Sequence, residues 1–294
     1  MTEPTARTRR VTAPAVAAAK RASTPLVMVT AYDAPSARIA DAAGVDLILV
    51  GDSVAMVVLG YDDTLQVRTE DMAHHVGAVA RTRPGALVVA DLPWMSYHLG
   101  RDDAVRNAAT LVRAGAGAVK LEGGRKRLNV VRGIIDAEIP VMGHLGLTPQ
   151  SFHALGGFKV QGRDLEAARA IVDDAIALAD AGCFAIVLEC VPDAVARLVT
   201  DSVPVPTIGI GAGRHCDGQV LVFHDLLGLE DRNLPKFVRR YAHLADDATA
   251  ALTRFAEDVR AGRFPASHET YHAADGVADA LELYGGSTTE HASA

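Results

Sequence analysis

Short apolar runs alternate with longer amphipathic stretches along this chain from residue 26 onward. The longer stretches carry apolar residues at three- and four-residue spacings, the period of a helix with one buried face. They predict helices at residues 34–43, 70–82, 103–114, 126–137 and 165–181. The short apolar runs predict eight β-strands, at residues 26–30, 45–50, 86–90, 118–121, 140–143, 184–188, 206–210 and 220–223.

The ends of the helical stretches carry residues that start and stop helices. Thr69 and Asp164 are predicted N-caps, because a short polar side chain can accept a hydrogen bond from the first turn. Eight strands separated by helices are the number found in the α/β fold of a (β/α)8 TIM barrel. The rival fold, an open doubly wound sheet, normally has a dinucleotide fingerprint after its first strand, and this sequence has none there. We therefore predict a single-domain TIM barrel.

The composition agrees with one large domain that has short extensions. The chain has 294 residues, 49% of them hydrophobic, and barrels of about 250 residues commonly form one domain. We predict a catalytic barrel at residues 22–265, preceded by an N-terminal arm at 1–21 that is mobile or caps the barrel. A C-terminal segment at 266–294 is expected to end in a mobile tail, and a helical region at 235–262 to complete the outer ring of helices.

Charge and cysteine content limit the partners and the compartment. A formal net charge of −7 disfavours binding to nucleic acid or to anionic membranes. No apolar run approaches the ~20 residues of a membrane span. We interpret the basic residues near the N-terminus as part of the arm rather than as an organelle-targeting peptide. The three cysteines lack the spacing of metal ligands and indicate a reduced, cytoplasmic protein; they are Cys183, Cys190 and Cys216.

Ionisable residues stand where the apolar strands end. At the ends of the predicted strands, or one or two residues beyond them, are Asp52, Asp91, Lys120 with Glu122, His144 and Glu189. In a parallel barrel these ends lie on one face, which carries the active site. Side chains two residues apart on a strand point to the same side, so Lys120 and Glu122 share one side. We assign the whole set to the barrel interior, because an ionisable group facing the covering helices would be costly to bury.

Four carboxylates would then converge with one obvious countercharge, Lys120. Carboxylates at close quarters repel one another unless a cation lies among them. Oxygen ligands without cysteine favour magnesium over zinc. Strand-end acids that only cap neighbouring loops are the alternative, and this alternative weakens as several successive strands end in acids.

The same residues lie in sequence blocks that resemble the ketopantoate hydroxymethyltransferase family. The blocks occur in the family's order between residues 22 and 265, and the ordered set is far more specific than any one block. They are Thr30-Ala-Tyr-Asp33, Val50-Gly-Asp-Ser53, Ala90-Asp-Leu-Pro93, Val119-Lys-Leu-Glu-Gly-Gly124, Gly143-His-Leu-Gly-Leu-Thr-Pro-Gln-Ser151, Val160-Gln-Gly162, Leu188-Glu-Cys190 and Gly209-Ile-Gly-Ala-Gly213.

The resemblance implies a role for each site residue. Asp52, Asp91 and Glu122 would hold one Mg²⁺ per subunit, directly or through water. The 2-oxo acid would be bound by Asp52, Ser53, Asp91, Lys120 and His144, and Glu189 would be the general base. The resemblance also implies the TIM barrel, 5,10-methylenetetrahydrofolate as the one-carbon donor, and a homodecamer.

The implied reaction belongs to pantothenate biosynthesis. Glu189 would take the C3 proton of 3-methyl-2-oxobutanoate, and the magnesium-stabilised enolate would attack the donor's methylene carbon, giving ketopantoate. Two other functions compete with this one. The first is a magnesium-dependent 2-oxo acid lyase or mutase of the isocitrate lyase and phosphoenolpyruvate mutase type, although the Lys-Lys-Cys-Gly-His-type loop of that group is absent. The second is a catalytically silent barrel that binds a ligand or serves as a scaffold.

Several residues also have purely structural interpretations. Lys120 could form an ion pair with Glu122 or with an acid on a neighbouring strand, and Glu189 could pair with a neighbouring Lys or Arg. His144 could bond a backbone carbonyl. The glycines of residues 209–213 could suggest a phosphate site, but a tight turn or a close backbone approach is sufficient reason for them.

Overall fold

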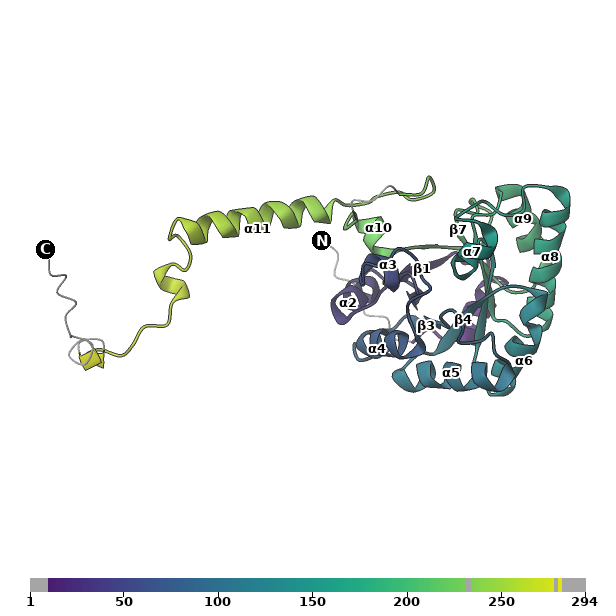
Figure 1. Cartoon of the computed structure of the whole chain (residues 1–294), viewed down its shortest axis with the longest axis horizontal. Coiled ribbons are helices and arrows are strands. Elements are labelled where there is room, and N and C mark those ends of the chain that lie inside the picture. Colours follow the sequence, from purple (N-terminus) through teal and green to yellow (C-terminus); the bar gives the residue numbers. More distant parts are fainter. Residues whose placement is uncertain (1–9, 231–233, 278–279, 282–294) are drawn as a thin grey trace, which may run out of the picture. The chain divides into compact units, whose positions relative to one another are not determined.

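Eight parallel strands pair in sequence order and close on themselves as a barrel (Figure 1). The computed structural model describes residues 10–230, 234–277 and 280–281. The last strand closes against the first, with Met28 opposite Val220. The strands are β1 (Leu26–Thr30), β2 (Leu47–Val50), β3 (Leu87–Asp91), β4 (Ala118–Glu122), β5 (Val141–Gly146), β6 (Ala185–Glu189), β7 (Thr207–Ile210) and β8 (Gly218–Leu221). The predicted TIM barrel is confirmed, and each predicted strand overlaps an observed one.

The helices that connect successive strands cover the outer face of the barrel (Figure 1). Those that follow the early strands match the predictions closely, and they are α2 (Ala34–Ala42), α4 (Thr69–Ala80), α5 (Arg101–Ala114), α6 (Leu128–Asp136) and α8 (Leu165–Asp180). Shorter or unpredicted helices are α1 (Ala13–Ala19), α3 (Val54–Val57), α7 (Phe152–Leu155), α9 (Asp193–Ser202) and α10 (Phe223–Leu227). The described residues also contain the 3₁₀ turns η1 (Arg125–Arg127), η2 (Pro149–Ser151) and η3 (Ser267–Glu269).

The two predicted N-caps had different outcomes. Asp164 caps α8 as predicted, and its carboxylate accepts a hydrogen bond from the Ala167 N–H at 2.8 Å. The prediction for Thr69 was wrong, because Thr69 is the first helical residue of α4 and Arg68 is its N-cap. The Asp71 carboxylate accepts a hydrogen bond from the Arg68 N–H at 2.8 Å, so this backbone donor at the start of α4 has a partner. A carboxylate in the first turn can thus replace a capping hydroxyl.

Two apolar clusters divide the core. The larger lies between the strands and the helices, and the smaller is formed by side chains that alternate with it along the strands, including Val89 and Val187. Ala13 and Val16 of α1 belong to the smaller cluster. The Val11 N–H donates to the Gly85 carbonyl just before β3, so α1 lies at the amino ends of the strands. The helix α1 therefore does not cover the carboxyl ends of the strands, where the ionisable residues lie.

The link from β7 to β8 departs from the regular pattern, because it contains no helix. Residues 211–217 return the chain directly, and Gly211 and Gly213 have positive φ angles of 66° and 79°. A Cβ at Gly211 would come within 2.6 Å of the Phe237 ring, so a side chain there would displace it. The structure therefore agrees with a tight turn and a close approach as the reason for these glycines.

The chain forms two compact units, residues 1–243 and residues 244–294. The second unit contains α11 (Leu244–Arg260), which is shorter than the helical region predicted at 235–262. Its Phe255 ring packs edge-on against Phe264, with centroids 5.3 Å apart. Most of the predicted tail, residues 282–294, and the first nine residues of the predicted arm lie outside the described residues. No helix within the described ranges is long and apolar enough to cross a membrane.

Candidate active site

Three carboxylates lie together at the carboxyl ends of β2, β3 and β4. Asp52, Asp91 and Glu122 are only 5%, 3% and 4% exposed. The backbone N–H of Asp52 donates to Asp91 Oδ2 at 3.1 Å. Gln150, from the turn after β5, spans the other two: its side-chain Nε2 donates to Asp52 Oδ2 at 2.8 Å, and its backbone N–H donates to Glu122 Oε2 at 3.1 Å. The predicted convergence of these acids is therefore present in the structure.

Lys120 is buried in the same cluster and is paired with Asp91. The two residues are opposite each other in the β3–β4 register, and Lys120 Nζ lies 2.8 Å from Asp91 Oδ1. Burial alone would lower the pKa of Lys120, but attraction by Asp91, Glu122 and Asp52 outweighs it and raises that pKa. Lys120 is therefore a fixed cation at the base of the site.

His144 connects this cluster to Glu189. Its Nδ1 atom lies 3.2 Å from Lys120 Nζ and 3.4 Å from Glu122 Oε1. On the other side of the ring, Nε2 lies 3.2 Å from Glu189 Oε2, within ion-pair distance although not aligned for a hydrogen bond. Burial and Lys120 lower the pKa of His144, whereas the interactions with Glu122 and Glu189 raise it, to about 9 overall. The ring faces side chains, and the carbonyl partner considered from sequence is not its partner.

Glu189 is the most accessible acid of the set. Its side chain is 17% exposed, against 4% for Glu122. Cys190, the next residue, has a φ of +48°, a value that non-glycine residues seldom adopt. The backbone thus turns sharply right after Glu189, and the Cys190 carbonyl accepts from the Gln161 N–H at 2.9 Å. Such strain is commonly kept at functional sites.

Ser53 lies beside the cluster, immediately after Asp52. Its hydroxyl is 2.8 Å from the hydroxyl of Tyr32, a residue that is 2% exposed. Burial raises the pKa of Tyr32, with Ser53 opposing the shift. Tyr32 remains a neutral phenol at ordinary pH, and it fixes the Ser53 side chain from the β1 side of the barrel.

Two site residues, Gln150 and Tyr97, were not predicted from the sequence. The Tyr97 hydroxyl donates to Gln150 Oε1 at 2.6 Å and accepts from the Glu122 N–H at 3.3 Å. Gln150 Nε2 also donates to the Leu92 carbonyl at 3.0 Å. Gln150 lies within one of the sequence blocks quoted above, four residues beyond the end of β5, and its place in that block was the available signal. Tyr97 stands six residues beyond the end of β3 and carried no comparable signal.

The donor set fits a hard divalent cation held partly by water. Burial is the largest cause that raises the pKa of Asp52, followed by repulsion from Asp91 and Glu122. Across the described chain, no three His, Cys, Asp or Glu side chains are grouped closely enough to hold a metal by themselves. Magnesium commonly uses only one or two protein carboxylates and completes its shell with water and substrate. The carboxylates of Asp52, Asp91 and Glu122 would suit such an ion, directly or through water, with water and substrate completing its shell.

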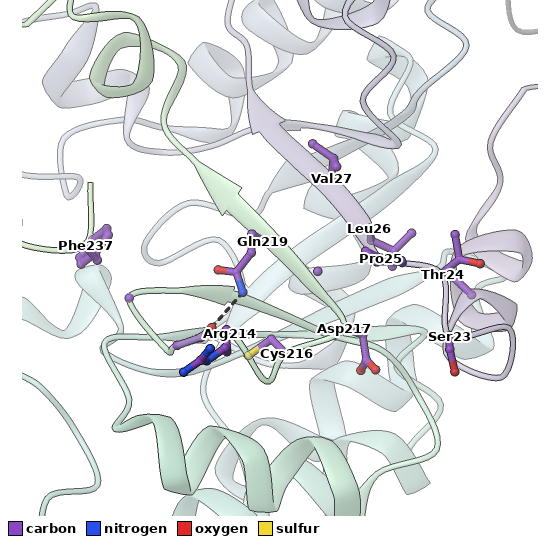
Figure 2. Close-up of a pocket in the computed structure, with 14 residues that line it drawn as sticks. Ser23, Thr24, Pro25, Leu26, Val27, Arg214, Cys216, Asp217, Gln219 and Phe237 are labelled. Atoms are coloured by element: carbon purple, nitrogen blue, oxygen red, sulfur yellow. Dashed lines mark hydrogen bonds between the residues drawn. The ribbon is translucent and has the colours of Figure 1, made fainter. Parts of the chain in front are cut away.

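A separate cavity of about 720 Å³ lies away from these acids, against the first residues of β1 and β8 (Figure 2). Its wall includes Phe237, Cys216 and Asp217. Asp217 is already paired with Lys20 at 2.9 Å, and Gln219 donates to the Gly213 carbonyl at 2.9 Å (Figure 2). None of the predicted site residues lines this cavity, so we place the chemistry at the carboxylate cluster.

The cysteines provide no nucleophile in the structure. All three are free thiols. Burial raises the pKa of Cys183 to about 12, and burial together with Glu189 raises that of Cys190 to about 11. Burial also raises the pKa of Cys216. A thiol with so little thiolate at neutral pH is a poor nucleophile.

Comparison with known proteins identifies relatives along most of the chain. Residues 10–267 match the family model described as ketopantoate hydroxymethyltransferase. The chain is 55% identical to 3-methyl-2-oxobutanoate hydroxymethyltransferase 2 of Bradyrhizobium diazoefficiens, over 92% of this chain and 93% of that protein. It is 57% identical to 3-methyl-2-oxobutanoate hydroxymethyltransferase of Moorella thermoacetica, over 89% of this chain and 98% of that protein.

Solved structures share the fold at low sequence identity. A phosphonopyruvate hydrolase in complex with oxalate and Mg²⁺ superposes with a TM-score of 0.56 at 16% identity, covering 94% of this chain and 95% of that one. A 2,3-dimethylmalate lyase, described as a member of the phosphoenolpyruvate mutase and isocitrate lyase superfamily, gives a TM-score of 0.55 at 18% identity, covering 94% and 98%. At this identity the likeness supports the barrel fold and no particular reaction.

Proposed function

This chain belongs to the ketopantoate hydroxymethyltransferase family, and from that premise we propose that it forms ketopantoate for pantothenate biosynthesis. The reaction transfers a hydroxymethyl group from 5,10-methylenetetrahydrofolate to 3-methyl-2-oxobutanoate. The observation that carries the proposal is the line of contacts from Asp91 through Lys120 and His144 to Glu189. It connects a buried acid cluster with an accessible carboxylate, as removal of a proton beside an activated carbonyl requires.

The oxo acid binds at the carboxylate cluster in this proposal. Asp52, Asp91 and Glu122 would hold the magnesium ion, directly or through water, as the cluster's excess of negative charge favours. When bound, magnesium supplies Lewis-acid stabilisation of the charge that develops on the substrate's keto oxygen, which is worth several kcal/mol. Lys120 offsets the remaining negative charge of the substrate from the base of the site, and the Ser53 hydroxyl binds it from the β2 side.

Glu189 removes the proton from C3. Its greater exposure places it toward the mouth of the barrel, where a substrate carbon can approach it. His144 lines the pocket and positions the Glu189 carboxylate through Nε2. The contact is not aligned before substrate binds, as is common for catalytic hydrogen bonds in free enzymes. Water adds to the methylene carbon of the donor, whose carbon–nitrogen bonds break so that tetrahydrofolate leaves. The enolate attacks the one-carbon unit thus released, and the proton that Glu189 took from C3 returns to the new alkoxide, so the hydroxyl oxygen of ketopantoate comes from water.

The rival functions have less support. A lyase or mutase reaction would rest on structural neighbours below 20% identity, which share only the barrel. A catalytically silent barrel would not account for relatives above 50% identity that are named hydroxymethyltransferases. Mixing the protein with magnesium, 3-methyl-2-oxobutanoate and methylenetetrahydrofolate should give ketopantoate. Retro-aldol cleavage of a 2-hydroxy acid without ketopantoate formation would overturn the proposal.

The resemblance also extends the proposal to assembly and compartment. We propose a homodecamer in the cytoplasm, which agrees with three free cysteines in the structure. Light scattering should give about ten times the 30.9 kDa subunit mass. A monomer at every concentration tested would refute this assembly.

A further inference from the structure

Three nitrogen-bearing side chains cluster beside the active site without a role in the chemistry described above. They are His98, in the loop after β3, and Lys126 and Arg127, in the turn η1 after β4. Both segments follow carboxyl ends of strands, so the cluster lies on the same face of the barrel as the acids. In a chain with a formal net charge of −7, the two neighbouring cations Lys126 and Arg127 at the mouth of the barrel are suited to attract an anionic group.

Gly123 shows that two of these side chains turn toward the site. It follows Glu122 directly, it is buried, and its φ is +110°. A Cβ built there would lie 3.1 Å from Cγ of Arg127 and 3.2 Å from Cε of Lys126. Both side chains therefore fold back over the residue beside Glu122. A larger residue at position 123 would push both away.

The neighbouring Arg125 behaves differently. Its Nε atom lies 2.8 Å from Asp174, and its Nη1 atom lies 3.6 Å from Asp173, both on α8. Among the residues that the structure describes, neither Lys126 nor Arg127 has a carboxylate within ion-pair distance. Arg125 is therefore ion-paired, whereas its neighbours Lys126 and Arg127 in the same turn remain available to bind an anion.

Arg127 and His98 also carry unsatisfied buried nitrogens. Arg127 Nε and His98 Nδ1 have no hydrogen-bond partner within the described part of the chain. The Arg127 guanidinium lies 5.4 Å from the centre of the Tyr97 ring, whose hydroxyl reaches Glu122 and Gln150. Burial, with repulsion from Arg127 and Lys126, lowers the pKa of His98 to about 4. His98 is thus neutral at neutral pH and can contribute a hydrogen bond beside the two cations.

We infer that His98, Lys126 and Arg127 form a subsite for the glutamyl carboxylates of the folate donor. The inference rests on the proposed function, since it assigns the far end of the co-substrate used there. A carboxylate is matched by unpaired cations with a donor beside them, and a guanidinium can bind it with two parallel bonds. The Tyr97 ring links this cluster to the acids, because the Arg127 guanidinium lies 5.4 Å from its centre and its hydroxyl contacts the Glu122 N–H and Gln150. A donor whose one-carbon unit reaches the acid cluster carries its carboxylates at its opposite end, where they can meet these cations.

The test compares donors that carry one or three glutamates across matched variants. Arg127→Met keeps the stem over Gly123 but removes the charge, and Lys126→Ala removes the second cation. Each should raise the KM for the donor by about tenfold, the loss expected for one charge-assisted hydrogen bond. The kcat and the KM for the oxo acid should stay within about twofold, and the triglutamate donor should lose its advantage over the monoglutamate. Arg125→Ala is the control, because it removes the same charge from a neighbouring residue that is already paired with Asp173 and Asp174.

Each outcome decides between the two proposals. A donor KM that is unchanged in Arg127→Met and Lys126→Ala overturns the subsite, and so does an equal effect in Arg125→Ala, which would indicate a diffuse field. A rise in the KM for the oxo acid in either variant would show that the cluster binds the oxo acid rather than the donor, and would also overturn the subsite. If the wild-type protein makes no ketopantoate, the proposed function fails. Calorimetric titration with tetrahydrofolate triglutamate then tests the subsite alone, and equal affinity of wild type and Arg127→Met overturns it.

Discussion

The substitution Glu189→Gln tests the proposed base most directly. Glutamine keeps the size of the side chain, and its oxygen can still face His144 Nε2, which lies 3.2 Å from the present carboxylate. Glu189 is bonded to none of the three buried acids, so their contacts should remain intact. The change therefore removes basicity and little else. Positioned general bases contribute roughly 100- to 10,000-fold, which corresponds to about 3 to 5.5 kcal/mol of activation free energy.

The assay is hydrogen exchange at C3 of 3-methyl-2-oxobutanoate in heavy water, with magnesium and without folate. If the enolate forms before the donor binds, the wild-type protein should exchange that hydrogen, and NMR will show the loss of its signal. Glu189→Gln should exchange about 100-fold more slowly or worse, while its affinity for the oxo acid stays near that of the wild type. Exchange at the wild-type rate would show that another residue is the base and would refute the mechanism.

Three further predictions follow from the contacts of the site. Asp91→Ala should lose magnesium-dependent binding of the oxo acid and all ketopantoate formation, because it removes a proposed metal ligand and the partner of Lys120. Full turnover by this variant in metal-free buffer would contradict the metal site. Gln150→Met should lower the free energy of unfolding by about 3 kcal/mol in urea titrations, because it leaves buried polar partners unsatisfied, and a loss below about 1 kcal/mol would refute the bridging role. Alkylation of Cys190 by iodoacetamide, followed by peptide mass spectrometry, should be slow at pH 7 and rise about tenfold per pH unit to pH 9, since its thiolate forms only near pH 11. A plateau below pH 9 would contradict the raised pKa.

Local pattern was sufficient to predict the barrel and the membership of its acid cluster. Buried parallel strands are continuous apolar runs, so a charged residue at the end of such a run is conspicuous. The two-residue period of a strand then gives the side of each residue, and Val89 and Val187 lie inside the barrel as that period requires for Asp91 and Glu189. These conclusions needed only the sequence, because each depends on residues that are close together in the chain.

The partners inside the site depended on the tertiary structure. The sequence left Lys120 free to pair with Glu122 or with a neighbouring strand's acid, and the β3–β4 register selected Asp91. Gln150 reaches Asp52 across 98 positions of the chain, and no local pattern encodes so distant a contact. The same holds for Gly211, because the ring that a Cβ there would meet at 2.6 Å belongs to Phe237, 26 positions along the chain. Strand periodicity is a local property of the backbone, whereas hydrogen-bond partners are chosen by whichever loops the closed barrel brings within reach.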